Sequence, residues 1–356
     1  MRIGILKYLI GSACVACCAA CSANGVGAEN AAPNPAGPYH VAQTIHLGGP
    51  GRWDYPLADP AAKLVYVTRQ THVQVVGMAD GKVVADLTGM RGNHGVAIAP
   101  EQGRCFVSDG QANAVLVFDT RTFKQLGVVP AGENPDAILY DPASHRVMAF
   151  DGRGKDVTVI DPAAEPGPKA VVGHIPLDGK PEFAVADGKG RVYVNIEDRD
   201  SITQIDSAAM KVLATWKIDG GEGPSGLAID PVHHHLFSGC DNKVMGIVDS
   251  ESGKTLGTVP IGEGVDGCGF DPGTGEAFAS CGDGTLTVVK EAEAGKFQVE
   301  QTVQTKRGAR TMTVDPATHT IYLPTAEFAE GAAGQGRRPA TKPDSFMLVV
   351  VSRAEK

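Results

Sequence analysis

The chain has 356 residues, including 45 glycines and 23 prolines, which favours many short strands joined by turns over long helices. Its formal net charge of -9 makes the surface as a whole repel phosphate backbones, so we do not expect a nucleic acid as partner. The length is sufficient for one large domain or two of ordinary size.

A secretory signal peptide is predicted for residues 1–28. Arg2 and Lys7 precede an uncharged run of small and apolar residues that is too short to span a bilayer. Small residues favour cleavage after Ala28, and the alternative is a lipoprotein signal in which Cys21 is lipidated. Residues 29–38 are rich in alanine and proline and form a flexible tether in either case. We therefore expect a periplasmic or otherwise extracytoplasmic protein without a transmembrane span, anchored by lipid if Cys21 is modified.

The rest of the chain is a repeat. The pattern apolar-x-apolar-Asp-Pro, or a close variant, recurs about every 43 residues, from "PLADP" at residue 56 to "MTVDP" at residue 312. Each of the seven copies continues with a second strand such as "RVYVNI" and a third such as "SITQID". Six copies add a fourth strand. Four short antiparallel strands in a period of this length are typical of a β-propeller blade.

The seventh copy ends after its third strand, at Val351. The segment "YHVAQTIHL" at residues 39–47 has the pattern of a fourth strand and can complete this last blade, which removes the exposed sheet edges. The predicted fold is therefore all-β, a seven-bladed β-propeller over residues 39–353 whose ring is closed by the N-terminal strand. We expect one domain and a monomer.

Each repeat carries a polar residue at the same place, just before strand one. In a propeller these segments surround one mouth of the central channel, so we expect seven polar side chains to converge there. Together they supply four carboxylates, one imidazole, one guanidinium and one hydroxyl. The seven residues are Asp54, His94, Asp136, Glu182, Ser225, Asp266 and Arg310.

Several kinds of chemistry suit this ring. It can bind a small polar ligand, a cation or a peptide from a partner protein. The carboxylates of Asp54, Asp136, Glu182 and Asp266 are candidate ligands for Ca²⁺, Mg²⁺, Mn²⁺ or Zn²⁺. His94 or Glu182 could act as a general base while Arg310 stabilises an anion or a developing oxyanion. The alternative is a solvated polar lining without a specific ligand, since turns favour Asp and Ser in any case.

Further contacts are expected around the ring. The turns that follow strand two form an outer ring at the same mouth. Arg69, at the end of strand two of the first repeat, is the member of this ring least typical of a turn, so we expect it to bind an anion as well. Trp53 and Phe183 flank the inner ring, where they either stack on a ligand or wedge neighbouring blades together. An insertion at residues 325–345 lies on the same side of the predicted ring.

Four cysteines follow the leader: Cys105, Cys240, Cys268 and Cys281. The expected register places Cys240 opposite Ser225 and Cys281 opposite Asp266. Equivalent positions in neighbouring blades are distant for a direct bond, so a Cys240–Cys268 bridge is the favoured pairing. A thiolate site and simple burial as small apolar residues are the alternatives.

The repeats resemble the YVTN-repeat (YncE-like) family of exported bacterial β-propellers. "LVYVT" at residues 64–68 is close to the family signature, and "RVYVN" at residues 191–195 is a second copy. The resemblance covers about residues 39–353 and implies a binding function, because most of the family has no established reaction. The chain is also similar to lactonase and streptogramin-lyase propellers, which suggests a metal-dependent hydrolase or lyase as the alternative, although their catalytic motifs are not matched. A protein-interaction scaffold is the second alternative.

Overall fold

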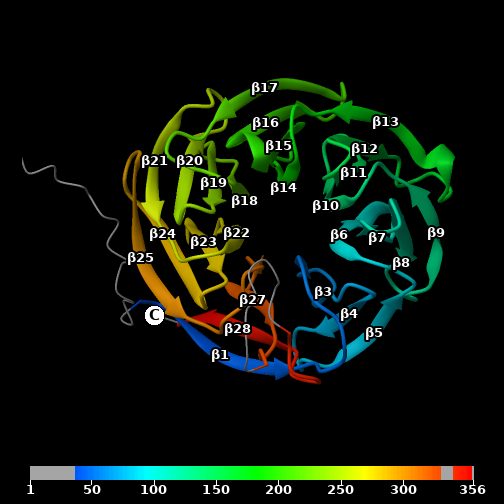
Figure 1. Ribbon diagram of the computed structural model, residues 1–356, viewed down its shortest axis with the longest axis horizontal. Coiled ribbons are helices and arrows are strands. Elements are labelled where there is room, and N and C mark those ends of the chain that lie inside the picture. The colour runs from blue at the N-terminus through cyan, green and yellow to red at the C-terminus, as the bar shows by residue number, and fades with distance from the viewer. Residues whose placement is uncertain (1–36, 330–339, 355–356) are drawn as a thin grey trace, which may run out of the picture.

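The computed structural model describes residues 37–329 and 340–354. The predicted signal peptide and residues 29–36 of the tether lie outside these residues, so both stay predictions. The described strands form seven antiparallel sheets of four strands each, arranged as a ring around a central channel (Figure 1). The all-β, seven-bladed propeller is thereby confirmed. The described residues contain no helix with the length and apolar character that a membrane crossing requires.

Each blade runs from strand one beside the channel to strand four at the rim. Blade one contains β2 (Pro56–Asp59), β3 (Leu64–Thr68), β4 (His72–Gly77) and β5 (Val83–Thr88). Blade two contains β6 (Asn93–Ala99), β7 (Arg104–Asp109), β8 (Ala114–Asp119) and β9 (Gln125–Pro130). Blade three contains β10 (Pro135–Asp141), β11 (Arg146–Asp151), β12 (Asp156–Ile160) and β13 (Val171–Pro176). Blade four contains β14 (Pro181–Ala186), β15 (Arg191–Ile196), β16 (Ser201–Asp206) and β17 (Lys211–Lys217).

The second half of the ring repeats this order. Blade five contains β18 (Pro224–Asp230), β19 (His235–Cys240), β20 (Val244–Asp249) and β21 (Thr255–Pro260). Blade six contains β22 (Val265–Asp271), β23 (Glu276–Cys281), β24 (Thr285–Glu293) and β25 (Lys296–Gln304). Blade seven contains β26 (Thr313–Asp315), β27 (Thr320–Thr325), β28 (Met347–Arg353) and β1 (Tyr39–His46). Three 3₁₀ turns complete the described elements: η1 (Pro100–Gln102), η2 (Pro168–Ala170) and η3 (Glu197–Arg199).

The two ends of the chain meet in blade seven. β1 pairs antiparallel with β28, from Tyr39 opposite Arg353 to His46 opposite Met347, which confirms the predicted closure (Figure 1). Tyr39 also reaches blade six, because its backbone N–H donates to Gln301 Oε1 (2.9 Å) and its carbonyl accepts from Gln301 Nε2 (2.7 Å). The Tyr39 hydroxyl donates to Glu276 Oε2 over 2.6 Å. The closing strand is therefore held by both blades.

The core lies between neighbouring blades. Strands two and three are covered on both faces, as in β4, where all four central residues are buried. This double burial explains why these strands are continuous runs of β-branched and aromatic residues such as "LVYVT". The fourth strands form the rim and are more exposed, as in β5, where Leu87 is the one buried residue. Each blade thus depends on its neighbours for the burial of its apolar surface.

Strand one of blades two to six begins with a β-bulge. The pairing register shifts between Pro224 and Leu227 in β18 and between Val265 and Gly267 in β22. Consequently Pro224 lies opposite Cys240 and Val265 opposite Cys281, so the expected register was wrong by one residue. A bulge leaves a residue unpaired and changes the direction of its side chain. In these five blades the polar residue is the second residue of strand one, so it falls in this bulge and is turned toward the channel.

Of the alternatives for the cysteines, simple burial is confirmed and the Cys240–Cys268 bridge is not formed. All four cysteines of the described chain are buried as free thiols, and Cys240 Sγ donates to the carbonyl of Ser238 over 3.5 Å. Burial raises the pKa of Cys240 to about 11 and that of Cys281 to about 12, which disfavours a thiolate near neutral pH. These residues fill the core as small apolar side chains.

Replacing Gln301 by methionine tests how the ring is closed. The change preserves size but leaves the Tyr39 N–H and carbonyl without their buried partners, so we expect unfolding to cost about 2 to 4 kcal/mol less. Gln298→Met is the matched control, since Gln298 is exposed on the same strand. Chemical denaturation of both variants measures the difference. An equal effect of the two substitutions would contradict a role of Gln301 in closure.

Candidate ligand-binding site at the channel mouth

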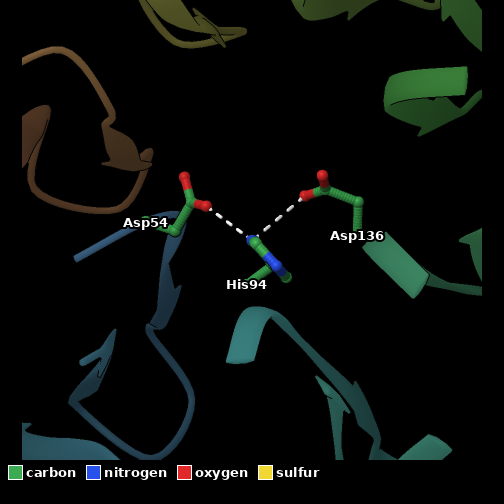
Figure 2. A group of neighbouring side chains, drawn as sticks. All are labelled: Asp54, His94 and Asp136. Atoms are coloured by element: carbon green, nitrogen blue, oxygen red, sulfur yellow. Dashed lines mark hydrogen bonds and ion pairs between the residues drawn. The ribbon is translucent and has the colours of Figure 1, made fainter. Parts of the chain in front are cut away.

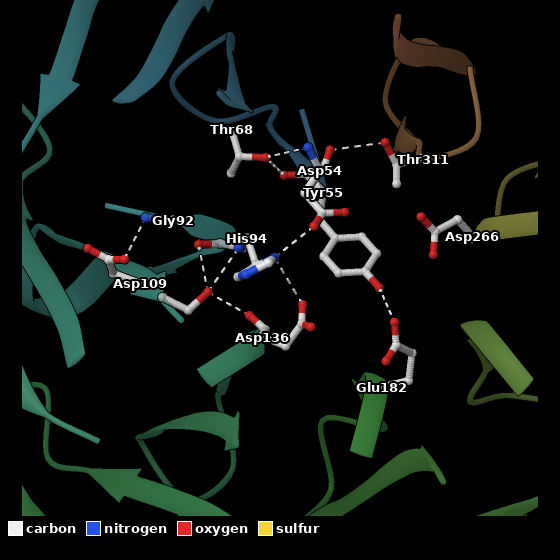
Figure 3. A network of polar contacts seen from close by, with 12 residues as sticks. Asp54, Tyr55, Thr68, Gly92, His94, Asp109, Asp136, Glu182, Asp266 and Thr311 are labelled. Carbon is white, nitrogen blue, oxygen red and sulfur yellow. Dashed lines mark hydrogen bonds and ion pairs between the residues drawn. The ribbon is translucent and has the colours of Figure 1, made fainter. Parts of the chain in front are cut away.

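The structure brings the seven polar residues of the repeat together at one mouth of the channel. Five of them, on blades one, two, three, four and six, are drawn around the opening in Figure 3. Direct contacts connect Asp54 with His94, and Ser225 with Asp266. Arg310 pairs with Asp266 as well.

Buried side chains of the preceding blade hold the backbone of these residues. The donor is the penultimate residue of strand two, and it donates to the carbonyl of the ring residue in the next blade. All three donors are fully buried, so the ring residues are fixed in position before any ligand binds. The pairs are Ser108 with Asp136 (2.5 Å), Asn195 with Ser225 (2.8 Å) and Ser280 with Arg310 (2.6 Å).

His94 lies between two carboxylates (Figure 2). Its Nδ1 is 2.8 Å from Asp54 Oδ2 and 3.5 Å from Asp136 Oδ1. Burial on its own would lower the pKa of His94, but the hydrogen bond to Asp54 and the charges of Asp136, Asp54 and Glu182 together raise it to about 9. In the absence of a metal, the imidazolium is therefore the counter-ion of both carboxylates near neutral pH.

Arg310 neutralises the opposite side of the ring. Its guanidinium forms an ion pair with Asp266 and lies 3.7 Å from Asp54 Oδ1. The Ser225 hydroxyl donates to the other oxygen of Asp266 over 2.8 Å. Asp266 therefore has partners on both oxygens, which explains why an acid is tolerated at this partly buried position.

Glu182 forms a third group with Tyr55 and Lys180. The Tyr55 hydroxyl donates to Glu182 Oε1 (3.3 Å), and Lys180 Nζ lies 3.1 Å from Glu182 Oε2 while it also pairs with Glu197. Burial and then the charge of Asp136 raise the pKa of Glu182 to about 7, although Lys180 opposes this. Sequence reasoning missed Lys180, although its place two residues before Glu182 was a usable signal.

Cations offset much of the negative charge at the mouth. The four carboxylates are faced by His94, Arg310 and Lys180. The proposed set of four metal-binding carboxylates does not gather at one point. Glu182 pairs with Lys180, and Asp266 pairs with Arg310. The group whose ligand atoms at the mouth all lie within 4.8 Å of one another is Asp54, His94 and Asp136.

Phe183 packs on Tyr55, with 4.8 Å between ring centroids, and contacts the apolar cores on both sides of blade four. This packing is that of a residue that wedges neighbouring blades together. Phe183 also lines a cavity of about 580 Å³ together with apolar residues such as Leu57 and Leu139. Its contact with a ligand at the mouth stays a prediction.

Arg69 is an internal support and not an anion contact. Its side chain is fully buried and lies over the Phe346 ring, 3.4 Å from the centroid. Its guanidinium donates to the carbonyls of Gly48 (2.9 Å), Gly49 (3.0 Å) and Pro50 (2.9 Å) and to Gln74 Oε1 (2.6 Å). These partners occupy the donors that an anion would need.

A cavity of about 500 Å³ opens beside the ring, between blades six, seven and one. Arg52, Arg307 and Arg310 line it together with the aromatic rings of Trp53 and Phe328. The described ends of the predicted insertion contribute to it as well, since Phe328 and Thr341 form an isolated β-bridge. Sequence reasoning missed Arg307, although the run "KRGAR" at residues 306–310 marks it.

A second cavity of about 400 Å³ adjoins the first. The two share Arg52, Trp53 and Gln70, and the second adds Asp54 and His94 of the polar ring. Trp53 packs on Phe346 with 5.7 Å between centroids, so it both wedges the blades and lines the two cavities. A ligand at this place would contact the arginines and the ring together.

Comparisons with known proteins support the fold alone. No protein-family model and no curated protein matches the chain. Among solved structures, hydrazine synthase of Kuenenia stuttgartiensis is similar, with a TM-score of 0.68 and 14% identity over 78% of this chain and 94% of that one. The structure of U3-55K is similar with a TM-score of 0.71 and 8% identity over 89% of this chain and 99% of that one. At these identities only the propeller is shared.

The titration of His94 tests the electrostatics of the mouth. Folding raises its pKa from 6.5 to about 9, so its stabilising contribution is complete below pH 6.5 and is lost as the pH rises through 9. We expect the unfolding free energies of wild type and His94→Gln, both treated with chelator, to differ most below pH 6.5 and to converge above pH 9.

The pKa itself can be read by NMR of the imidazole. It should fall in Asp54→Asn, which removes the hydrogen-bonded partner, and stay unchanged in Asp178→Asn, a surface control. A wild-type value at or below 6.5 would contradict the proposed role of the two carboxylates.

Proposed function

We propose that this chain is an exported propeller of the YVTN-repeat type that binds a small organic anion at the channel mouth. The observation that carries the proposal is the cavity of about 500 Å³ in which three arginines and two aromatic rings lie beside the polar ring. Export is inferred from the predicted signal peptide. The mass of the mature protein would distinguish cleavage after Ala28 from lipidation of Cys21.

Two of the three arginines, Arg52 and Arg307, carry a charge that no ion pair of the described residues compensates. Arg52 and Arg307 are exposed, and neither forms an ion pair within residues 37–329 and 340–354. Arg310 is oriented by Asp266, so its direction is set before binding. Guanidinium groups bind carboxylates and phosphates through paired hydrogen bonds, which makes an anion the matching ligand class.

The aromatic residues indicate a planar part in the ligand. Trp53 and Phe328 lie 6.3 Å apart between ring centroids, and the Arg307 guanidinium lies over Phe328 at 5.3 Å. A ring or conjugated chain packed against these side chains would remove apolar surface from water while its anionic end meets the arginines. Asp54 and His94 of the adjoining cavity would bind a hydroxyl or amine of the same ligand.

Binding can be followed by the fluorescence of Trp53. Trp216→Phe removes the other tryptophan of the chain, so the remaining emission reports on the cavity. We expect phthalate and benzoate to change this emission saturably and Arg307→Gln to weaken binding about tenfold or more, because a charged hydrogen bond is lost. Arg121→Gln, a surface arginine between strands three and four of blade two, is the control.

Two outcomes would contradict anion binding in this cavity. If neither aromatic carboxylate changes the emission or the melting temperature, or if Arg307→Gln and Arg121→Gln behave alike, the anion site is ruled out.

A metal-dependent hydrolase or lyase is the second candidate, favoured by the Asp54, His94 and Asp136 group. Two carboxylates and an imidazole with ligand atoms within 4.8 Å fit Zn²⁺ or Mn²⁺, and these three side chains would hold the ion in place of the His94 proton. A bound divalent ion would polarise the carbonyl of an ester or lactone. Glu182 would serve as general base and Arg310 would orient the substrate.

This candidate predicts activity that depends on the metal and on the ring. Protein loaded with Zn²⁺ or Mn²⁺ should hydrolyse simple lactones or aryl esters, and Asp136→Asn should lower the rate about a hundredfold or more. Asp178→Asn should have no effect. A loaded wild type without turnover on these substrates would eliminate the hydrolase and leave the binding function.

A further inference from the structure

A second group of polar side chains lies on one face of blade three. Asp151 pairs with Asp156 across β11 and β12, and Thr158 pairs with His174 across β12 and β13. Because alternate residues of a strand share a face, this register places all four side chains on the same side of the sheet. The ligand atoms of Asp151, Asp156 and His174 lie within 4.8 Å of one another.

Asp151 has an oxygen without a partner. The residue is fully buried, and its Oδ2 accepts a hydrogen bond from Thr158 Oγ1 over 2.7 Å. Its Oδ1 is buried too and has no hydrogen-bond partner in the described structure. Leaving a carboxylate oxygen unsatisfied in the interior is costly, so this atom indicates a missing ligand.

The equivalent residue of blade two shows how such an acid is normally satisfied. Asp109 accepts from the backbone N–H of Arg91 (2.7 Å) and of Gly92 (2.8 Å), and the second of these contacts is drawn in Figure 3. In blade three the residue corresponding to Gly92 is Asn134, and its N–H donates to Asn113 Oδ1 instead (2.9 Å). Asp151 therefore lacks the amide donor that corresponds to Gly92.

Two glycines allow the neighbouring loops to approach the carboxylates of Asp151 and Asp156 closely. A Cβ on Gly132 would lie 2.6 Å from Asp151 Cγ, and a Cβ on Gly154 would lie 2.5 Å from Asp156 Oδ1. Both distances are shorter than any side chain tolerates, so glycine is required where the two loops meet the carboxylates. The result is a small cradle around the oxygens of Asp151 and Asp156.

Charge in the cradle is incompletely balanced. Asp156 Oδ2 lies 3.1 Å from His174 Nδ1, and within the described residues no lysine or arginine forms an ion pair with Asp151 or Asp156. The nearby Lys155 is directed to Asp198 at 2.8 Å. This distinguishes blade three from the channel mouth, where Arg310 and Lys180 face the carboxylates.

We propose that Asp151, Asp156 and His174 bind one divalent transition-metal ion, Zn²⁺ or Mn²⁺, at the edge of blade three. The buried Oδ1 of Asp151 would be one ligand, and Thr158 would orient that carboxylate through its hydrogen bond to Oδ2. Two oxygens and one imidazole nitrogen suit these ions, and ligand atoms around one ion lie about 3 to 3.5 Å apart, as Asp156 and His174 already do. The site would join three strands of one blade and does not depend on the ligand of the mouth.

Metal binding by the full mature chain tests the proposal. Protein stripped with chelator is dialysed against Zn²⁺ or Mn²⁺, and bound metal is measured by elemental analysis and calorimetry. We expect Asp156→Asn and His174→Gln each to weaken the affinity about tenfold or more and to reduce the bound metal by one ion per chain. Both side chains are partly exposed, so these variants should fold.

Asp136→Asn, at the channel mouth, is the matched control and should retain the blade-three ion. Co²⁺ substitution adds a spectroscopic readout in the Asp136→Asn background, in which the mouth cannot contribute an ion. The visible absorption of the bound ion should be present in Asp136→Asn and disappear in the Asp136→Asn/Asp156→Asn double variant. The proposal is overturned if stripped wild type binds no ion, or if Asp156→Asn and His174→Gln bind as much metal as wild type with unchanged affinity.

Discussion

Closure of the ring by β1 and β28 is the interaction on which the rest of the structure depends. Each blade buries its apolar faces against two neighbours, so an open ring would expose two faces and the edge of an incomplete blade. The junction is secured from both sides: β28 supplies the strand pairing, and Gln301 and Glu276 of blade six hold Tyr39. Because neighbouring blades share their cores, a distortion of this junction would change how the blades pack and therefore where their side chains lie at the mouth.

The mouth follows from a local feature repeated around a closed ring. A bulge at the start of strand one turns one polar residue of each of five blades inward. For Asp136 and Ser225, a buried side chain of the preceding blade also holds the backbone. Bringing four carboxylates together would be unfavourable without counter-ions. His94, Arg310 and Lys180 supply them, and the protein thereby gains a rigid rim next to a cavity rich in arginine. Such a preformed rim lowers the entropy lost when a ligand binds.

The two metal-compatible groups differ in how they are satisfied. At the mouth His94 Nδ1 is hydrogen-bonded to Asp54 and lies 3.5 Å from Asp136, so the charged imidazole is the counter-ion of both carboxylates. In blade three, Asp151 retains an unsatisfied oxygen and His174 reaches only Asp156. Similar residue types therefore point to different ligands, an anion at the mouth and a cation in blade three.

The sequence by itself determined the number of blades, the closing strand and the seven residues of the ring, because each is set by a period that does not depend on the surroundings. It could not determine which of those residues would pair. Tyr55 of blade one reaches Glu182 of blade four, and Arg69 turns away from the mouth to bind carbonyls of residues 48–50. The strand register was misplaced by one residue because a bulge does not show in an alternating pattern. The state of the cysteines, which are free thiols, was not fixed by the sequence either. The tertiary structure alone decided these points, since they depend on distances between segments far apart in the chain and on the free energy of burying each charge.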